Sequence, residues 1–286
     1  MTLSLTLLLL STFAVAPVTS DDRVVFISDR DGGLQVWLAE PDGSNPRRLT
    51  EGPPAHFPRC SPDGLDVVFE RGPPGAREIW VQGIADGPAR RLALSAAEYS
   101  TPEWLPDRSA IIFTHKVGLY DRIALMRADG AGSPKWVTDH PWDDVMASPT
   151  PDGRAVVFHS YRHGPNNPEI YRRDLETGHE TRITAIDGQD YEAATDGRRV
   201  VFSSNRAGET FQLYMTDLEG GDPRQLTTGD TDAWGPRFGG RGTLFVTGPP
   251  GRRKPHVIGE DGLPRALWSG AHDDYSAAWC SRQGAR

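Results

Sequence analysis

A β-branched or apolar pair followed by phenylalanine recurs six times along the chain. The six copies are Val24-Val25-Phe26, Val67-Val68-Phe69, Ile111-Ile112-Phe113, Val156-Val157-Phe158, Val200-Val201-Phe202 and Thr243-Leu244-Phe245. Successive phenylalanines lie 43, 44, 45, 44 and 43 residues apart, which indicates internal repeats. Short runs of such residues favour strands, and no long stretch has a helical period.

Polar turns divide each repeat of about 44 residues into four short strands. An Asp-Gly turn such as Asp152-Gly153 precedes the strand that ends in phenylalanine. A strand centred on an aromatic residue, such as Ile170-Tyr171, follows, and a short last strand ends at Thr184. This pattern predicts an all-β fold, a six-bladed β-propeller of four-stranded blades.

The two ends of the repeat region complement each other. The first repeat begins directly at the Val24-Val25-Phe26 strand, so its opening strand is missing. Residues 275–280 read as an extra opening strand after the sixth repeat. We therefore expect the C-terminal strand to complete the first blade, which closes the ring and leaves no open sheet edge.

The N-terminus reads as an export signal. Residues 3–16 are mostly apolar, which is too short for a membrane span and typical of a signal peptide. Small residues at Val18 and Ser20 predict cleavage after Ser20. We therefore expect a signal peptide at 1–20, a single propeller domain at 21–286, and a periplasmic or secreted location.

Charge and hydropathy exclude two classes of protein. The 39 acidic and 31 Lys and Arg residues give a net charge of −8, without a basic stripe to bind nucleic acid. No apolar run reaches the roughly 18 residues of a membrane span. A closed ring needs no partner to cover its edges, so we expect a monomer.

The repeat units resemble the WD-like repeats of the TolB propeller family. The matching segments are Ser61-Pro62-Asp63-Gly64, Ser203-Ser204-Asn205-Arg206 and Leu213-Tyr214-Met215-Thr216-Asp217. The resemblance extends over all six repeats and implies a six-bladed fold and an envelope-associated, periplasmic protein. TolB also has an α/β domain ahead of its propeller. In this chain the repeats follow the predicted signal peptide closely, so we expect that domain to be lacking.

Two sets of repeated polar residues have structural interpretations. Arg30, Arg162 and Arg206 recur after the phenylalanine strand and are expected to pair with nearby carboxylates or carbonyls. Cys60 and Cys280 each precede a serine, and we place them at equivalent positions of adjacent blades. Equivalent positions of neighbouring blades are expected to be farther apart than a disulfide allows, so packed free thiols are favoured.

Acidic residues recur before the innermost strands, and they are the predicted ligand-binding residues. Each lies four residues before one of Pro102, Ala147, Ala194, Pro236 and Ala278. The five are Glu98, Asp143, Asp190, Asp232 and Asp274. Loops at equivalent positions converge around one mouth of a propeller channel, so this set predicts a negative mouth.

Three interpretations of this acidic set remain open. The carboxylates could cap their own loops. They could bind a cationic partner or ligand, with Tyr191, Trp234 and other aromatic residues of the same loops as cation–π walls. They could also hold Ca²⁺, or a transition metal together with His56, His140 and His272, although no local metal motif supports this.

The leading functional hypothesis is a non-enzymatic module that binds through the loops at one channel mouth. Its expected partner is an envelope or extracellular protein, or a cationic small ligand, with no cofactor required. The alternative is a metal-assisted carbohydrate lyase or hydrolase with its site in the channel. No Gly-x-Ser-x-Gly motif or other nucleophile motif is present in the sequence, so binding is favoured over catalysis. A purely structural component of a larger assembly is the third hypothesis.

Overall fold

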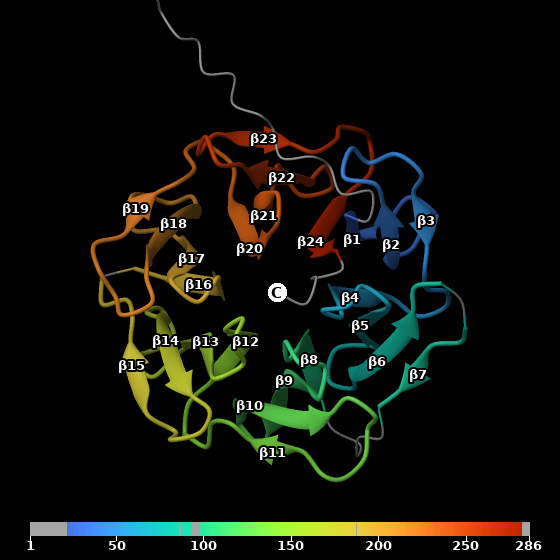
Figure 1. The fold of residues 1–286 in the computed structure, drawn as a ribbon. Coiled ribbons are helices and arrows are strands. Elements are labelled where there is room, and N and C mark those ends of the chain that lie inside the picture. The colour runs from blue at the N-terminus through green and yellow to red at the C-terminus, as the bar shows by residue number, and fades with distance from the viewer. Residues whose placement is uncertain (1–21, 86, 93–97, 187, 282–286) are drawn as a thin grey trace, which may run out of the picture.

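The computed structural model describes residues 22–85, 87–92, 98–186 and 188–281. In these residues 24 strands form six antiparallel sheets of four strands each, arranged around a central axis (Figure 1). The predicted six-bladed propeller is therefore confirmed. The predicted signal peptide lies outside the described residues.

Within each blade the strands run in order from the channel to the outer rim. From the innermost strand outward, blade 1 contains β24 (Asp274–Cys280), β1 (Arg23–Ser28), β2 (Gln35–Ala39) and β3 (Arg47–Arg48). Blade 2 contains β4 (Ala55–Cys60), β5 (Asp66–Arg71), β6 (Glu78–Gly83) and β7 (Arg90–Arg91). Blade 3 contains β8 (Tyr99–Trp104), β9 (Ala110–Val117), β10 (Tyr120–Arg127) and β11 (Lys135–Trp136).

The other three blades have the same order. Blade 4 contains β12 (Asp144–Pro149), β13 (Ala155–Ser160), β14 (Glu169–Asp174) and β15 (Glu180–Arg182). Blade 5 contains β16 (Asp190–Thr195), β17 (Arg199–Ser204), β18 (Gln212–Asp217) and β19 (Arg224–Gln225). Blade 6 contains β20 (Ala233–Gly239), β21 (Gly242–Thr247), β22 (Lys254–Ile258) and β23 (Pro264–Ala266).

The repeated phenylalanines form the core between blades. All six are at most 1% exposed: Phe26, Phe69, Phe113, Phe158, Phe202 and Phe245. In four blades the phenylalanine lies opposite an aromatic residue of the next strand, as Phe158 does with Tyr171. Burying a Phe side chain contributes about 1.5–3 kcal/mol, so the repeat itself supplies much of the apolar stabilisation.

The last strand of the chain closes the ring. β24 pairs antiparallel with β1, placing Ala278 opposite Val25, and becomes the innermost strand of blade 1. The predicted completion of the first blade is confirmed.

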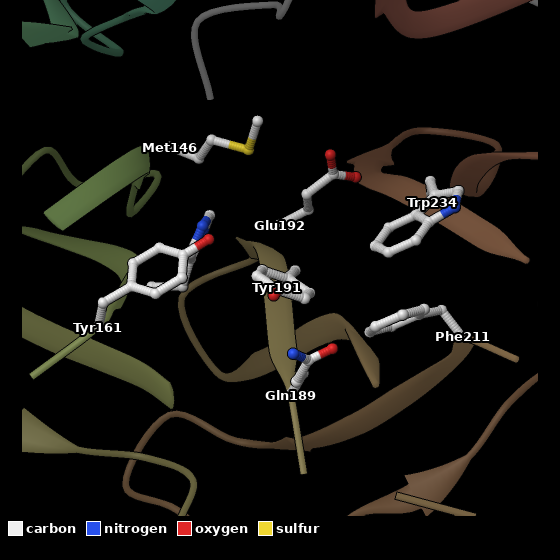
Figure 2. Close-up of a pocket in the computed structure, with 8 residues that line it drawn as sticks. Met146, Tyr161, Gln189, Tyr191, Glu192, Phe211 and Trp234 are labelled. Atoms are coloured by element: carbon white, nitrogen blue, oxygen red, sulfur yellow. The ribbon is translucent and has the colours of Figure 1, made fainter. Parts of the chain in front are cut away.

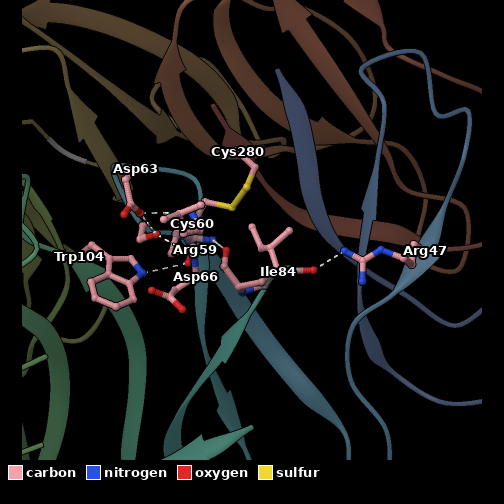
Figure 3. Close-up of a disulfide and its surroundings, with 11 residues drawn as sticks. Arg47, Arg59, Cys60, Asp63, Asp66, Ile84, Trp104 and Cys280 are labelled. Atoms are coloured by element: carbon pink, nitrogen blue, oxygen red, sulfur yellow. Dashed lines mark hydrogen bonds between the residues drawn. A yellow bond between two sulfur atoms is a disulfide. The ribbon is translucent and has the colours of Figure 1, made fainter. Parts of the chain in front are cut away.

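The two cysteines form a disulfide, so the prediction of free thiols was wrong (Figure 3). Cys60 pairs with Val67, the residue two positions before Phe69. In blade 1 the residue two positions before the phenylalanine is Val24, and it pairs with Trp279. Trp279 is therefore equivalent to Cys60, and Cys280 lies one position beyond it. Side chains alternate between the faces of a strand, so this offset turns Cys280 to face Cys60 across the blade boundary. Their Cα atoms are 5.2 Å apart.

Every innermost strand has a register shift at its third residue. At that residue the backbone has a positive φ in all six blades: Phe57, Thr101, Met146, Glu192, Gly235 and Ser276. Five of these are not glycine, and a left-handed conformation costs such residues about 1–2 kcal/mol. The bulge turns the innermost strands locally where they line the channel.

The register also places two sets of loops on the same face. Asp190, at the start of β16, pairs with Ser204 at the end of β17. The loops before the innermost strands therefore lie beside the loops that join second and third strands. We call this face the channel mouth.

Candidate functional site

The repeated arginines lie within their blades, as the sequence predicts. Arg206 Nε donates to Ser204 Oγ at 2.9 Å, and Arg206 Nη2 lies 3.0 Å from Asp190 Oδ2. Its guanidinium also stacks on Phe202 and Tyr214. Arg30 with Asp274 and Arg162 with Asp144 repeat the carboxylate pairing, at 3.0 and 3.4 Å.

Three of the five predicted acidic residues lie in the mouth loops. Each accepts a backbone N–H from the preceding blade: Glu98 from Gly75 at 3.1 Å, Asp143 from Asp121 at 2.8 Å, and Asp232 from Phe211 at 2.9 Å. These bonds link neighbouring blades. They use the carboxylates structurally, although between blades and not within their own loops as the capping interpretation expects. Ligand binding by these carboxylates stays a prediction.

The other two, Asp190 and Asp274, lie one position later, on the innermost strands themselves. Both are buried and paired with the arginines of their own blades. The residues equivalent to Asp143 are instead Gln189 and Asp273, as the strand register shows. Both strands contain two consecutive alanines, Ala193-Ala194 and Ala277-Ala278. The count back along the sequence began at the second alanine of each pair, whereas the register makes the first one equivalent to Ala147.

Each of the three predicted histidine ligands contacts residues of its own surroundings. His140 stacks on Trp142, and its Nδ1 lies 2.9 Å from Asp144. His272 lies 3.9 Å from Asp29, and His56 lies opposite Glu70 in the blade 2 register. No three His, Cys, Asp or Glu side chains come together as a metal site within the part of the chain that the structure describes.

A pocket of about 400 Å³ opens at the channel mouth between blades 4, 5 and 6 (Figure 2). Four aromatic side chains form its walls, with ring centroids 4.4 Å apart for Phe211 and Trp234 and 5.5 Å for Tyr191 and Phe211. Tyr161 lies 6.3 Å from Tyr191. The pocket opens widely to solvent, and its volume lies within the range of small-ligand sites.

Glu192 is the only charged residue that lines this pocket in the described chain. Its side chain starts from the positive-φ position of β16, and its Oε2 accepts the Gly235 N–H at 2.6 Å. Burial raises the pKa of Glu192, and nearby Arg237, the Gly235 N–H and Arg59 oppose that increase.

His159 and Tyr161 supply further polar atoms. His159 is 3% exposed, and burial lowers its pKa to about 3, so its imidazole is neutral at physiological pH. Burial also raises the pKa of Tyr161, as do the neighbouring Tyr191 and Asp143. The pocket at neutral pH therefore has neutral rings and one titratable carboxyl group.

The sequence indicated only part of this pocket. Tyr191 and Trp234 are recognisable as aromatic residues of the mouth loops, but no pattern marks Glu192, His159 or Phe211. His159 and Phe211 lie on or beside second and third strands, outside the loops in which the acidic residues recur. The side-chain direction of Glu192 depends on the bulge, which leaves no signal in residue type.

The structure thus defines a six-bladed β-propeller with a ligand-sized aromatic pocket at one channel mouth. Residues 11–245 match the family of the tricorn protease N-terminal β-propeller domain, and the chain belongs to this family.

Among curated proteins, the Tol-Pal system protein TolB of Bordetella pertussis is 27% identical over 157 residues. That match covers 54% of this chain and 35% of TolB. The uncharacterized protein Atu1656 of Agrobacterium fabrum is 25% identical over 181 residues, which cover 63% of this chain and 60% of the relative. The chain thus matches about a third of the first relative and less than two thirds of the second.

Solved structures show the same fold. TolB from Acinetobacter baumannii superposes with a TM-score of 0.75 at 22% identity, covering 90% of this chain and 66% of that one. A putative TolB from Agrobacterium tumefaciens gives a TM-score of 0.67 at 20% identity and covers 91% and 98%. No helix among the described residues is long and apolar enough to cross a membrane.

Proposed function

We propose that the protein is a non-enzymatic, extracytoplasmic binding module that holds a segment of an envelope or extracellular protein at its channel mouth. The observation that carries the proposal is the aromatic pocket between blades 4, 5 and 6. Three separate blades supply its walls, so it is held by the rigid ring and needs little ordering when a partner binds.

Two features support an extracytoplasmic location. The Cys60–Cys280 disulfide is typical of oxidising compartments. The name of the Bordetella relative places that protein in the Tol-Pal system. Residues 1–20 would then be removed on export.

Site-specific photo-crosslinking in the native host tests the binding proposal. A photoreactive phenylalanine analogue replaces Phe211 in the pocket or, as a control, Leu263, which is 59% exposed on the opposite face. We expect a defined partner adduct from position 211 that disappears when Trp234→Ala is added. Equal adducts from both positions, or none from position 211, would contradict the proposal.

Intact mass of the protein from the host tests export separately. The expected mass is that of residues 21–286 with two hydrogens fewer than the dithiol, and no alkylation before reduction. A full-length chain with two alkylated thiols would show that the protein stays in a reducing compartment.

The metal-assisted lyase or hydrolase has less support than the binding module. A metal-assisted reaction needs converging ligands, and the described residues bring no three such side chains together.

A further inference from the structure

The aromatic walls of the pocket differ from the other aromatic surfaces of the ring. Several rings elsewhere are covered by the protein's own arginines, for example Tyr214 by Arg206 and Tyr275 by Arg253. Across the described residues, no arginine or lysine stacks on Tyr161, Tyr191, Phe211 or Trp234. The four rings contact one another but are only partly buried, so their exposed surfaces can attract a cation from outside through the ring quadrupole.

The charge inside the pocket is also suited to a cation. Glu192 lines it, whereas none of its described lining residues is Lys or Arg. Oε2 of Glu192 is bound by the Gly235 N–H, and Oε1 has no hydrogen-bond partner within the described part of the chain. Two guanidinium groups, those of Arg59 and Arg237, lie near Glu192. Arg59 pairs with Glu103 at 3.1 Å, whereas Arg237 offsets part of the Glu192 charge.

His159 lies beside these rings as a neutral imidazole. Its Nδ1 is buried without a hydrogen-bond partner among the described residues, although the side chain lines the pocket. Its imidazole contacts the rings of Tyr161 and Tyr191 edge-on, at centroid distances of 5.7 and 5.2 Å. The neutral imidazole therefore adds an uncharged wall beside these rings and brings no positive charge that would repel a cation.

We propose that this pocket binds a primary alkylammonium group, with the carboxylate of Glu192 as its counter-ion and the aromatic rings around its methylenes. An ammonium brings three N–H donors and one positive charge, which complement these groups. The inference rests on the proposed binding function and specifies its chemistry. The ammonium can come from a lysine of the partner protein or from a free amine.

Calorimetric titration of the full chain tests the inference with n-butylammonium and with n-butanol as its neutral counterpart. We expect the ammonium to bind at least about tenfold more tightly, because only the charged probe pairs with Glu192. Glu192→Gln should remove about tenfold of the ammonium affinity and little of the butanol affinity. The glutamine oxygen can still accept the Gly235 N–H, and circular dichroism checks that the variant is folded.

Glu219→Gln is the matched control. It removes the same charge from the same blade, but Glu219 is exposed and follows β18 on the face opposite the mouth. We expect wild-type affinity from this variant. Equal binding of butanol and butylammonium, or equal losses in Glu192→Gln and Glu219→Gln, would overturn the proposal.

Two further probes distinguish the sources of the ammonium. Nα-acetyl-lysine amide should bind more tightly than butylammonium if the natural ligand is a lysine of a protein, and more weakly if it is a free amine. Either order supports the ammonium site. Partner cross-links at position 211 together with failure of every ammonium probe would overturn the ligand class and leave the binding module in place.

Discussion

Cys280, near the end of the chain, is bonded to Cys60, which lies 220 positions earlier on the innermost strand of the next blade. The bond joins β24 of blade 1 to β4 of blade 2. It therefore adds a covalent link at the junction where the ring is closed by its last strand. A chain constrained over so long a loop loses much of its freedom in the unfolded state.

We expect Cys60→Ala/Cys280→Ala to lower the free energy of unfolding by about 2–5 kcal/mol. Equilibrium urea unfolding of the oxidised wild type and of the double variant measures the difference. The reduced wild type is the control, and it should resemble the variant. Identical midpoints for all three proteins would show that the hydrogen bonds between β24 and β1 hold the ring without the disulfide.

Asp274 and Asp190 occupy equivalent positions, but their carboxyl groups differ in acidity. Burial acts against ionisation at Asp274, but hydrogen bonds from Ser28, Trp268 and Arg30 outweigh it and lower the pKa. At Asp190 burial dominates and raises the pKa, although Ser204 and Arg206 oppose it. Lys254, 3.3 Å from Asp274, contributes to the difference.

The contribution of Asp274 to stability should therefore depend on pH. Its pKa in the folded protein is below the ordinary 3.8, so its stabilisation is present above pH 3.8 and is lost as the pH falls through the folded value. Asp274→Asn should cost about 3 kcal/mol at pH 7 and less near pH 3. Urea unfolding at both pH values measures this.

Asp190→Asn is the control for that experiment. Because the pKa of Asp190 is raised, protonation favours the folded wild type, and the cost of the substitution should not decrease as the pH falls through 3.8. Parallel pH profiles for the two variants would contradict the assignment.

Gly235 and Gly239 on β20 should respond differently to alanine. A Cβ at Gly235 would meet only Glu192 Oε2 at 3.7 Å, and the other five blades hold non-glycine residues at this bulge. Left-handed strain and the lower entropy of the unfolded chain nearly offset each other. We expect Gly235→Ala to change stability by no more than about 1 kcal/mol.

A Cβ at Gly239 would clash with the indole of Trp279, which is held by a hydrogen bond to the Gly242 carbonyl. Gly239→Ala should therefore cost about 1–3 kcal/mol more than Gly235→Ala. Thermal and urea unfolding of the two variants compare them directly. A larger loss at Gly235 would show that the bulge of blade 6 requires glycine.

Ammonium binding should weaken as the pH falls, because only ionised Glu192 is a counter-ion. Burial raises its pKa above the ordinary 4.5, against the opposing effects of Arg237, the Gly235 N–H and Arg59. The midpoint of the loss should therefore lie above pH 4.5. Burial keeps His159 neutral until about pH 3, so it should not titrate in this range.

Calorimetry with butylammonium between pH 4 and 8 tests this expectation, and Glu192→Gln should give a flat profile. A pH-dependent variant would show that another group controls binding.

The sequence alone determined the number of blades, the phenylalanine core, the closing strand and the pairing of Arg30, Arg162 and Arg206. Each depends on residue types that recur at a fixed interval, because every blade must bury the same faces. The tertiary structure decided the exact register of the innermost strands, including their bulges and the shifts of one residue between blades. These features join Cys60 to Cys280, separate Asp190 and Asp274 from the mouth loops, and direct Glu192 into the aromatic pocket. Because strand side chains alternate in direction, one residue of register reverses a side chain, and composition carries no record of that register.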